Sequence, residues 1–598
     1  MMASLVMLTG ADITAHGQQQ RKPETAAAPS SCSRNSALEM IRQQVDATKT
    51  FDNAVQRITL LIRAADLLWP YQQDKARAAF TEAFELATRN FKEKGDELTR
   101  DGSLLIREDD QRYTVITAIA KHDYAWAKKL TERMLKEQQE ESEDKPNKDT
   151  QDDITTATRL LTMAAYLLSS DEAAALNFAR NSLQYPTTFY LSEFLYQLAT
   201  RDKSAADHFY KEALATYANA PMERLLYLSS YPFGNDREAG EMPGYAIYQV
   251  PSGFVPSLNL QRAFVQTILR RAQDFISNPS DLAHGDRLSE PEQVWLALTR
   301  LEKQIQQSLP DLTLAIEAAR GNLLTQLSED SQRSVHRMLD DDNPPKRTFD
   351  DQVETALKNP NVDRRDQQLT SAIISGSKDE TLDHVLSAVD KISDPTIRQP
   401  LLNWLYFERS QSAIQDQKLD EARKLAAKVE ELDQRAFLYS RIAEESLKQS
   451  AEQTQARDVL EEVVDAAGKA PNTPVTARAL LGAGYLYTKI DMNRAIAVIA
   501  EAVKCINRIE QPDFSRQFVI RRIEGKTFST YAAFVTPGFT PENAFREIGK
   551  VDFDGMLNQA SSFSDKSFRA TTTLVLADLC LQQTRQQKPE KTNKKPKP

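Results

Sequence analysis

The sequence predicts an all-α protein built from antiparallel helix hairpins, and two observations support this prediction. Glycine contributes only 18 of 598 residues, about 3% where about 7% is usual, while residues that favour helices recur throughout the chain. Apolar residues also return at helical spacing in segments separated by short polar turns. One long stretch, residues 231–258, breaks the pattern with four Gly, four Pro and five aromatic residues, and these favour a loop or short strands.

The first half of the chain contains consecutive helix pairs. Residues 53–68 have apolar side chains at helical spacing, and Trp69-Pro70 separates them from a second helix over residues 74–89. Because the turn between them is short, the two helices should form an antiparallel hairpin. The same pattern predicts the pairs 113–120 with 124–136, 154–168 with 171–183, 189–199 with 203–217 and, after a helix over 259–275, 289–307 with 311–327.

Local signals refine these boundaries. Ser169 with Glu172, and Ser289 with Glu292, have the spacing of capping boxes, in which each side chain satisfies a backbone N–H at the start of a helix. Residues 136–153 are dense in charge with a central Pro, which predicts a solvated loop, an acidic calcium or partner site being the less favoured alternative.

The second half is more regular. Ala422, Ala456 and Ala495 are separated by 34 and 39 residues, an interval typical of two-helix repeats. A second, smaller interruption over residues 525–541 contains Phe528, Tyr531 and Phe534, which suit a short strand or a buried loop. The expected pairs are 367–375 with 380–392, 397–414 with 420–432, 436–448 with 452–467, 475–488 with 493–507 and 542–557 with 567–582.

These elements predict an α-solenoid in two arrays. The polar sequence DDDNPPKR marks the boundary between them. We expect residues 1–36 to be a disordered N-terminus or the remnant of a signal peptide with a linker, 37–338 the first array including the 231–258 insertion, 339–350 a linker, 351–583 the second array, and 584–598 a disordered basic tail.

The N-terminal residues favour export. A short apolar start is followed by Ala15-His16-Gly17, which has small residues at the positions that signal peptidase requires, although a basic start is missing and Asp12 interrupts the apolar stretch. We therefore predict a periplasmic or secreted protein, with a cytoplasmic one as the alternative. Cys32 has Pro29 where a lipoprotein signal has Leu, so we do not expect a lipid anchor. No apolar run is long enough for a transmembrane segment.

The cysteines predict neither a disulfide framework nor a metal site. Cys32, Cys505 and Cys580 are odd in number and far apart in the sequence. Cys505 and Cys580 lie in apolar helical patterns, so we expect them to be core thiols.

The second helix of several pairs repeats a small residue, a large one four positions later and a small one after three more. Examples are Ala76, Phe80 and Ala83; Ala206, Tyr210 and Ala213; and Ala495, Ile499 and Ala502. In this pattern the chain resembles the tetratricopeptide and related helical-hairpin repeats, over roughly two thirds of its length. The resemblance implies that small residues let helices approach closely and that a concave groove binds a peptide or protein. The chain departs from the family at Phe194 and Glu444, where a small residue is typical, and only Pro186 ends a repeat as the family does.

Charge and motifs exclude several functions. The net charge is -10, and the only basic cluster is the tail, so we expect no nucleic-acid partner. The six histidines are isolated and no phosphate-binding or nucleophile motif occurs, so we expect no metal, no cofactor and no catalytic residues.

The 231–258 insertion is therefore the candidate site. Because a loop this long must bury side chains to stay ordered, we expect its aromatic residues to plug the loop onto neighbouring helices; alternatively, the rings could stack on a ligand. Asp236, Glu238 and Glu241 add carboxylates, which leaves an acid/base site as a third interpretation. The candidate binding residues are Tyr231, Phe233, Tyr245, Tyr248 and Phe254.

Two functions follow from these observations. The first is a non-enzymatic scaffold that binds a protein or peptide partner. The second is a carbohydrate-active enzyme on an α/α toroid that uses the carboxylates of the insertion. An open superhelix would exclude the second. The sequence specifies neither the partner nor the oligomeric state.

Overall fold

The computed structural model describes residues 32–586, apart from 96–97, 102–103, 108–109, 144–149, 235–236, 239–245, 249, 278–287, 343–347, 449–452, 511 and 513–517. Predictions for residues 1–31, the end of the basic tail and residues 235–236, 239–245 and 249 of the insertion therefore lie outside the described residues. Within them, the protein is an all-α repeat fold in which neighbouring helices pair, as the sequence predicts.

The first half runs from α1 to α15 and contains two short hairpins. Its helices are α1 (Arg34–Ala47), α2 (Ala54–Leu68), α3 (Gln73–Lys94), α4 (Gln111–Ala120), α5 (Tyr124–Glu143), α6 (Thr150–Leu167), α7 (Glu172–Ser182), α8 (Phe189–Arg201), α9 (Lys203–Tyr217), α10 (Met222–Leu225), α11 (Ser230–Phe233), α12 (Leu258–Ser277), α13 (Glu290–Ser308), α14 (Thr313–Gln326) and α15 (Glu329–Asp342). The hairpins pair β1 (Leu98–Asp101) with β2 (Leu104–Arg107) and β3 (Arg237–Glu238) with β4 (Ala246–Tyr248).

The second half runs from α16 to α27 and contains one longer hairpin. Its helices are α16 (Phe349–Leu357), α17 (Val362–Gly376), α18 (Leu382–Val389), α19 (Pro395–Gln415), α20 (Leu419–Ala426), α21 (Leu432–Lys448), α22 (Gln453–Lys469), α23 (Pro474–Tyr487), α24 (Met492–Ile506), α25 (Pro541–Gly549), α26 (Phe553–Ser561) and α27 (Lys566–Gln586). The antiparallel hairpin β5 (Phe518–Glu524) and β6 (Ser529–Val535) lies between α24 and α25 in the chain.

Buried small residues hold the helix pairs together. Ala206, Ala422, Ala456 and Ala495 are fully buried, as the repeat pattern requires. Ser410 is buried opposite Ala422 and donates a hydrogen bond to its carbonyl oxygen at 2.9 Å. These close approaches let adjacent helices pack at native density.

Several boundaries differ from the predictions. Helix α7 begins after Asp171, whose carboxylate accepts a hydrogen bond from the Ala174 N–H at 2.9 Å, so the predicted Ser169 capping box is wrong. The box at α13 is confirmed, because the Glu292 carboxylate accepts from the Ser289 N–H. Helices α5 and α6 extend into the predicted loop 136–153, and three helices rather than two follow β6.

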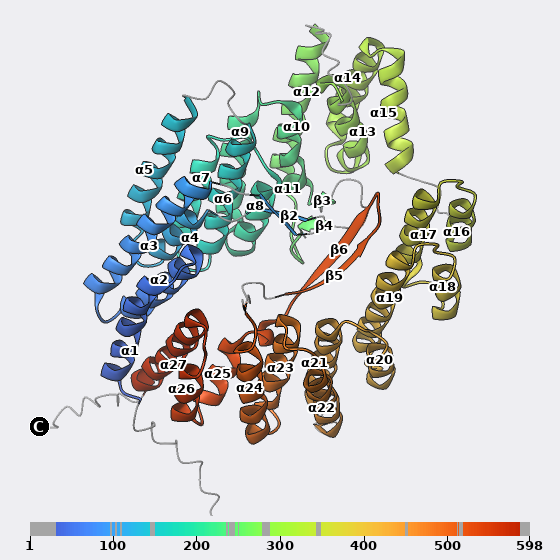
Figure 1. Ribbon diagram of the computed structural model, residues 1–598. Coiled ribbons are helices and arrows are strands. Elements are labelled where there is room, and N and C mark those ends of the chain that lie inside the picture. Colours follow the sequence, from blue (N-terminus) through green and yellow to red (C-terminus); the bar gives the residue numbers. More distant parts are fainter. Residues whose placement is uncertain are drawn as a thin grey trace, which may run out of the picture.

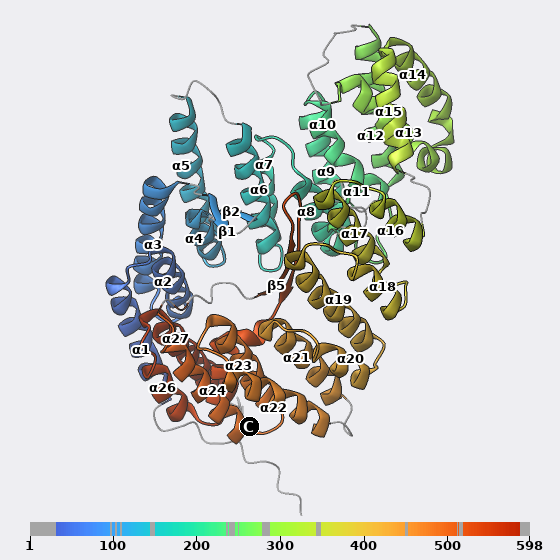
Figure 2. The same cartoon turned by 45° about the vertical axis from the view of Figure 1, so that its right-hand side comes forward.

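The helix pairs follow one another around a ring, with α1 lying beside α27 (Figures 1 and 2). A disulfide joins Cys32 to Cys580 at this junction, with a Cα–Cα distance of 5.5 Å. The prediction that Cys580 is a free core thiol is therefore wrong; Cys505 is free and buried, as expected. The array is closed at this point, which is the arrangement that the toroid hypothesis requires.

Apolar side chains form two cores. The larger extends over residues 32–335 and 407–581, and the smaller over residues 349–405 together with Ile523 of β5. The hairpin β5–β6 thus touches both cores, and it lies across the middle of the ring in both views (Figures 1 and 2). Helix α19 also contributes to both cores, through Leu405 and Phe407, so the hairpin and α19 together connect the two parts of the second half.

Candidate binding site

The described aromatic residues of the 231–258 insertion pack inside the protein. Tyr231 is 0% exposed, Phe233 is buried, and Phe254 packs against the larger core. The Tyr231 ring lies 5.5 Å from that of Tyr210 and 5.2 Å from that of Phe254, centroid to centroid. These contacts favour the interpretation that the rings fasten the insertion to the helices.

Polar partners complete this aromatic cluster. The Tyr231 hydroxyl donates to the Asp207 carboxylate at 2.9 Å, and the Lys203 ammonium group binds the same carboxylate at 3.0 Å. Burial, with the hydrogen bond to Asp207, raises the pKa of Tyr231. The phenol is therefore neutral and satisfied, which suits a structural role.

The other candidates of the insertion are not placed by the structure. Tyr245, Asp236 and Glu241 lie outside the described residues, and of Tyr248 in β4 and Glu238 in β3 only the backbone is described. Binding by these tyrosines and acid/base chemistry by these carboxylates stay predictions. Among the described residues, no group of three or more His, Cys, Asp or Glu side chains is placed to hold a metal ion.

The hairpin β5–β6 presents a second site, which the sequence only partly indicated. Strand β5 packs against α19 and α21. Arg521 of β5 is only 4% exposed in its side chain, pairs with Glu408 of α19 at 2.7 Å, and lies over the rings of Trp404 and Phe407. Burying a charged group this deeply is costly unless it is paired. The contacts of Arg521 with Glu408 and with the two rings therefore fix the position of β5 on the helices.

The tip of the hairpin is fastened to α17. Lys526 forms an ion pair with Asp363 at 3.0 Å, and the Thr527 hydroxyl hydrogen-bonds the Gln367 side chain at 3.0 Å. Phe528 packs against the smaller core. The hairpin is therefore fixed to the helices both at its tip and along β5.

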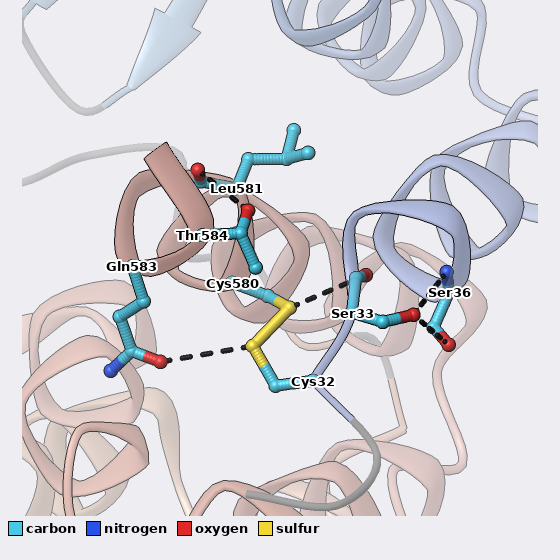
Figure 3. Close-up of a disulfide and its surroundings, with 7 residues drawn as sticks. All are labelled: Cys32, Ser33, Ser36, Cys580, Leu581, Gln583 and Thr584. Atoms are coloured by element: carbon cyan, nitrogen blue, oxygen red, sulfur yellow. Dashed lines mark hydrogen bonds between the residues drawn. A yellow bond between two sulfur atoms is a disulfide. The ribbon is translucent and has the colours of Figure 1, made fainter. Parts of the chain in front are cut away.

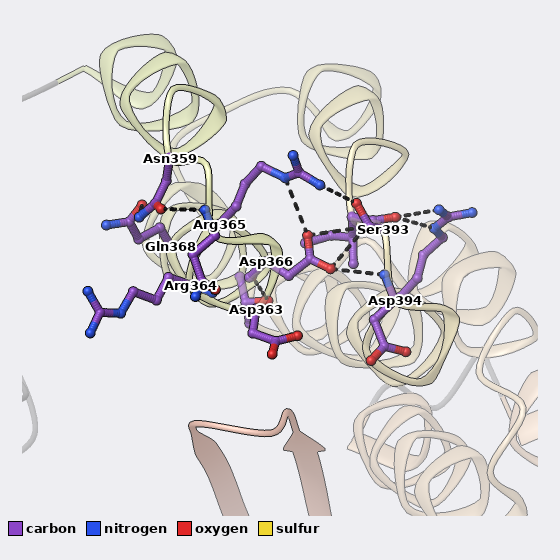
Figure 4. A network of polar contacts seen from close by, with 12 residues as sticks. Asn359, Asp363, Arg364, Arg365, Asp366, Gln368, Ser393 and Asp394 are labelled. Carbon is purple, nitrogen blue, oxygen red and sulfur yellow. Dashed lines mark hydrogen bonds and ion pairs between the residues drawn. The ribbon is translucent and has the colours of Figure 1, made fainter.

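Helix α17 is itself fixed to α19. Asp366 of α17 is buried, and its carboxylate accepts hydrogen bonds from the N–H groups of Ser393 and Asp394 at 3.1 and 2.9 Å, just before α19 begins (Figure 4). Because a buried carboxylate without partners is costly, this contact sets the angle between the helices that carry the hairpin.

One face of the hairpin is exposed and largely apolar. The side chains of β6 alternate, so that Ala532 and Phe534 are half-buried while Tyr531 is 50% and Val535 72% exposed. Ala533, between the last two, is exposed as well. An alternation of this kind is what a sheet with one free face shows.

The same residues lie on a free edge. The Gly525 N–H donates to the Phe528 carbonyl, and the register pairs Arg522 with Tyr531. Since hydrogen-bonded pairs alternate along antiparallel strands, the N–H and C=O groups of Tyr531, Ala533 and Val535 point away from β5. In the part of the chain that the structure describes, this sheet has no third strand.

The opposite edge is covered. The Gln434 side chain of α21 donates to the outward-facing Ile520 carbonyl of β5 at 3.3 Å. Within the described residues, the outward backbone groups of Tyr531, Ala533 and Val535 have no hydrogen-bond partner, and we define the β6 edge as residues 531–535.

A polar groove of about 360 Å³ lies near the hairpin tip, between α16 and α17. Amide and hydroxyl side chains and one guanidinium line it, and all of these can hydrogen-bond to a peptide main chain. The polar lining residues are Gln352, Thr355, Arg364, Gln367, Gln368 and Ser371.

The residues around Gly525 carry a sequence signal for a β-hairpin that includes β5. Residues 518–524 include Phe518, Val519, Ile520 and Ile523, and Gly525 follows before Phe528, Tyr531 and Phe534. Apolar and β-branched residues on both sides of a Gly-containing turn are typical of a hairpin.

Comparisons with known proteins do not assign this chain to a family. No protein-family model matches the sequence, and no curated protein matches it either. A solved structure described as a circular tandem repeat protein with novel repeat topology and enhanced subunit contact surfaces aligns with 93% of this chain and 99% of its own, at 11% identity and a TM-score of 0.14. At that TM-score the two backbones do not superpose, so the fold rests on the helix contacts described above. No described helix combines the length and apolarity needed to cross a bilayer.

Proposed function

We propose that this chain is a non-enzymatic scaffold that holds an extended segment of a protein partner along the β6 edge. The observation that carries the proposal is the combination of an unpaired strand edge and an exposed apolar face on Tyr531, Ala533 and Val535. Proteins usually protect such edges, because they pair with other strands. Here the neighbouring strand β5 is held by its contacts with α19 and α21.

Strand addition explains both features at once. Three outward residues offer three N–H donors and three C=O acceptors to a segment in extended conformation, and the affinity of such contacts comes from the main chain. Tyr531 and Val535, on the exposed face, would pack against alternate side chains of the partner and contribute specificity. We expect a partner segment with apolar residues at every second position.

The helical ring supplies the support for this edge. In tetratricopeptide-like repeats, which the helix pairs resemble, a concave surface binds peptides or proteins. We infer that this chain uses repeats of that kind to carry a strand edge into the middle of the ring. The carbohydrate-active alternative requires carboxylates of the insertion that the structure does not place, so it stays a prediction.

We also infer that the protein works in the periplasm or outside the cell. The Cys32–Cys580 disulfide supports this, because disulfides persist in oxidising compartments and are rare in the cytoplasm. The signal-like N-terminal residues point the same way.

Photocrosslinking from the native compartment tests the binding proposal. A photoreactive phenylalanine analogue replaces Val535 on the β6 edge or, as the matched control, Val551, which is 69% exposed in the turn between α25 and α26. We expect a discrete crosslinked species from position 535 and none from position 551. Equal patterns at the two positions, or no crosslink at either, would contradict the proposal.

A further inference from the structure

We propose that the Cys32–Cys580 disulfide clasps the ring shut, and that docking of α1 on α27 brings the two cysteines together to complete it. The two residues are 548 apart in sequence. Bringing two thiols so distant together in the unfolded chain costs loop-closure entropy. The fold therefore has to bring the cysteines together before they react with each other.

Contacts at the junction can do this without the disulfide. Arg585 of α27 hydrogen-bonds the Tyr71 hydroxyl and lies over its ring, and Arg34 of α1 lies over the same ring. Lys566, at the start of α27, donates to the Thr50 carbonyl oxygen at 3.1 Å. These groups place the end of the second half against the start of the first.

The sulfur atoms lie in a protected position. Cys32 is 6% exposed and Cys580 is 0% exposed. Around them, the Gln583 side-chain oxygen lies 3.7 Å from the Cys32 Sγ and the Ser33 carbonyl oxygen 3.5 Å from the Cys580 Sγ (Figure 3). Once formed, the bond is shielded from thiolates in solution, which must reach a sulfur atom to reduce it.

The chemistry requires a disulfide oxidant of the thiol–disulfide oxidoreductase class. The Cys32 thiolate attacks one sulfur of the oxidant's disulfide and forms a mixed disulfide, releasing the oxidant's other thiolate. The Cys580 thiolate then attacks the Cys32 sulfur and displaces the oxidant. Two cysteine thiols lose two protons and two electrons, and the oxidant leaves as a dithiol. Because the closed ring buries both sulfur atoms, the oxidant reaches Cys32 before α1 docks, and docking then brings Cys580 to the mixed disulfide.

Closure has two consequences. Among the described residues, helix α1 packs mainly against α2 and α27, and its buried residues are Ala37, Leu38 and Ile41, so without the clasp it can open locally. The bond also consumes the Cys32 sulfur, which a lipid thioether at this residue would need. In the closed ring Cys32 is therefore a structural residue and not a lipid anchor.

Two measurements on the full chain, isolated from an oxidising compartment, test the clasp. The first is mass spectrometry of a non-reduced digest, in which we expect a peptide pair linked through Cys32 and Cys580, with Cys505 alkylated only after denaturation. Recovery of Cys32 and Cys580 as free, alkylated thiols would overturn the proposal.

The second measurement is hydrogen exchange, with and without a phosphine reductant. Exchange of the α1 amides should rise at least about tenfold in Cys32→Ser, and in the reduced wild type, while α24 is unchanged. The reductant should have no further effect on Cys32→Ser, which controls for its action elsewhere. Identical α1 exchange in oxidised wild type and Cys32→Ser would contradict the clasp, and so would loss of protection throughout the ring. Neither measurement depends on the partner proposed for the β6 edge.

Discussion

Arg521 of β5 and Glu408 of α19 form an ion pair at 2.7 Å that is almost completely shielded from solvent. A two-stranded hairpin is marginally stable on its own. This pair, with the aromatic rings around the guanidinium, makes the hairpin part of the helical array. These contacts hold β5 on α19 and leave the β6 edge open among the described residues.

Removing this anchor should destabilise the protein strongly. Arg521→Met leaves Glu408, whose side chain is only 17% exposed, without its partner, and breaking a largely buried pair in this way costs about 3 kcal/mol. Urea unfolding measures the change. The matched control is Arg522→Met on the opposite face, where the pair with Glu524 at 3.4 Å is partly exposed and the cost should stay below about 1 kcal/mol. Equal costs for the two variants would mean that Arg521 does not anchor the hairpin.

Overpacking an alanine anchor tests the repeat architecture. Ala495→Leu forces extra methyl groups into the fully buried contact between α23 and α24 and should cost about 1 to 3 kcal/mol. Ala206→Leu should behave similarly. Ala497 lies on the exposed side of the same α24, so Ala497→Leu should change the unfolding free energy by less than about 0.5 kcal/mol. Unchanged melting temperatures in both buried variants would show that these alanines are not packing anchors.

His384 predicts a pH dependence at the start of the second half. Its Nδ1 lies 2.9 Å from the Glu380 carboxylate and its Nε2 2.9 Å from that of Asp350, so both nitrogens donate only when the ring is protonated. The hydrogen bond with Glu380, and then that with Asp350, raises the pKa of His384 above its ordinary value of 6.5, against the effect of desolvation.

The sign of the effect follows from linkage. Because the folded state holds this proton more tightly, the imidazolium stabilises α18 against α16 below pH 6.5, and the contribution is lost as pH rises through the folded-state pKa. The difference in unfolding free energy between wild type and His384→Gln should therefore shrink between pH 5.5 and pH 8, measured by urea unfolding. His208→Gln, at an exposed position of α9, is the control. A difference that stays constant or grows with pH would contradict this account.

The helix pairs could be predicted because their signal is local. Periodic apolar residues and buried anchors such as Ala422 and Ala495 repeat within each pair, and neighbouring pairs contact each other in order. Burial of Tyr231 could be expected because a long loop must bury side chains to stay ordered, although an aromatic ring in a loop also suits a ligand.

Long-range features could not be read in the same way. Cys32 and Cys580 meet only because the ring closes, and the curvature of the ring is a sum of small rotations between repeats that no local pattern encodes. The apolar pattern does not by itself predict strand β5, because Arg521 and Arg522 interrupt its apolar residues. The burial of Arg521 is explained by its contacts with Glu408 and Trp404, which are distant from it in the sequence.

The most direct test of the proposed function removes a single outward N–H from the β6 edge. Ala533→Pro deletes the donor of a residue that has no bonding role toward β5, a position at which edge strands tolerate proline. In the variant that carries the photoreactive group at position 535, we predict that Ala533→Pro lowers the crosslink yield about tenfold, because the partner's carbonyl loses its donor, while the melting temperature is unchanged. An undiminished crosslink from a folded Ala533→Pro protein would contradict strand addition at β6.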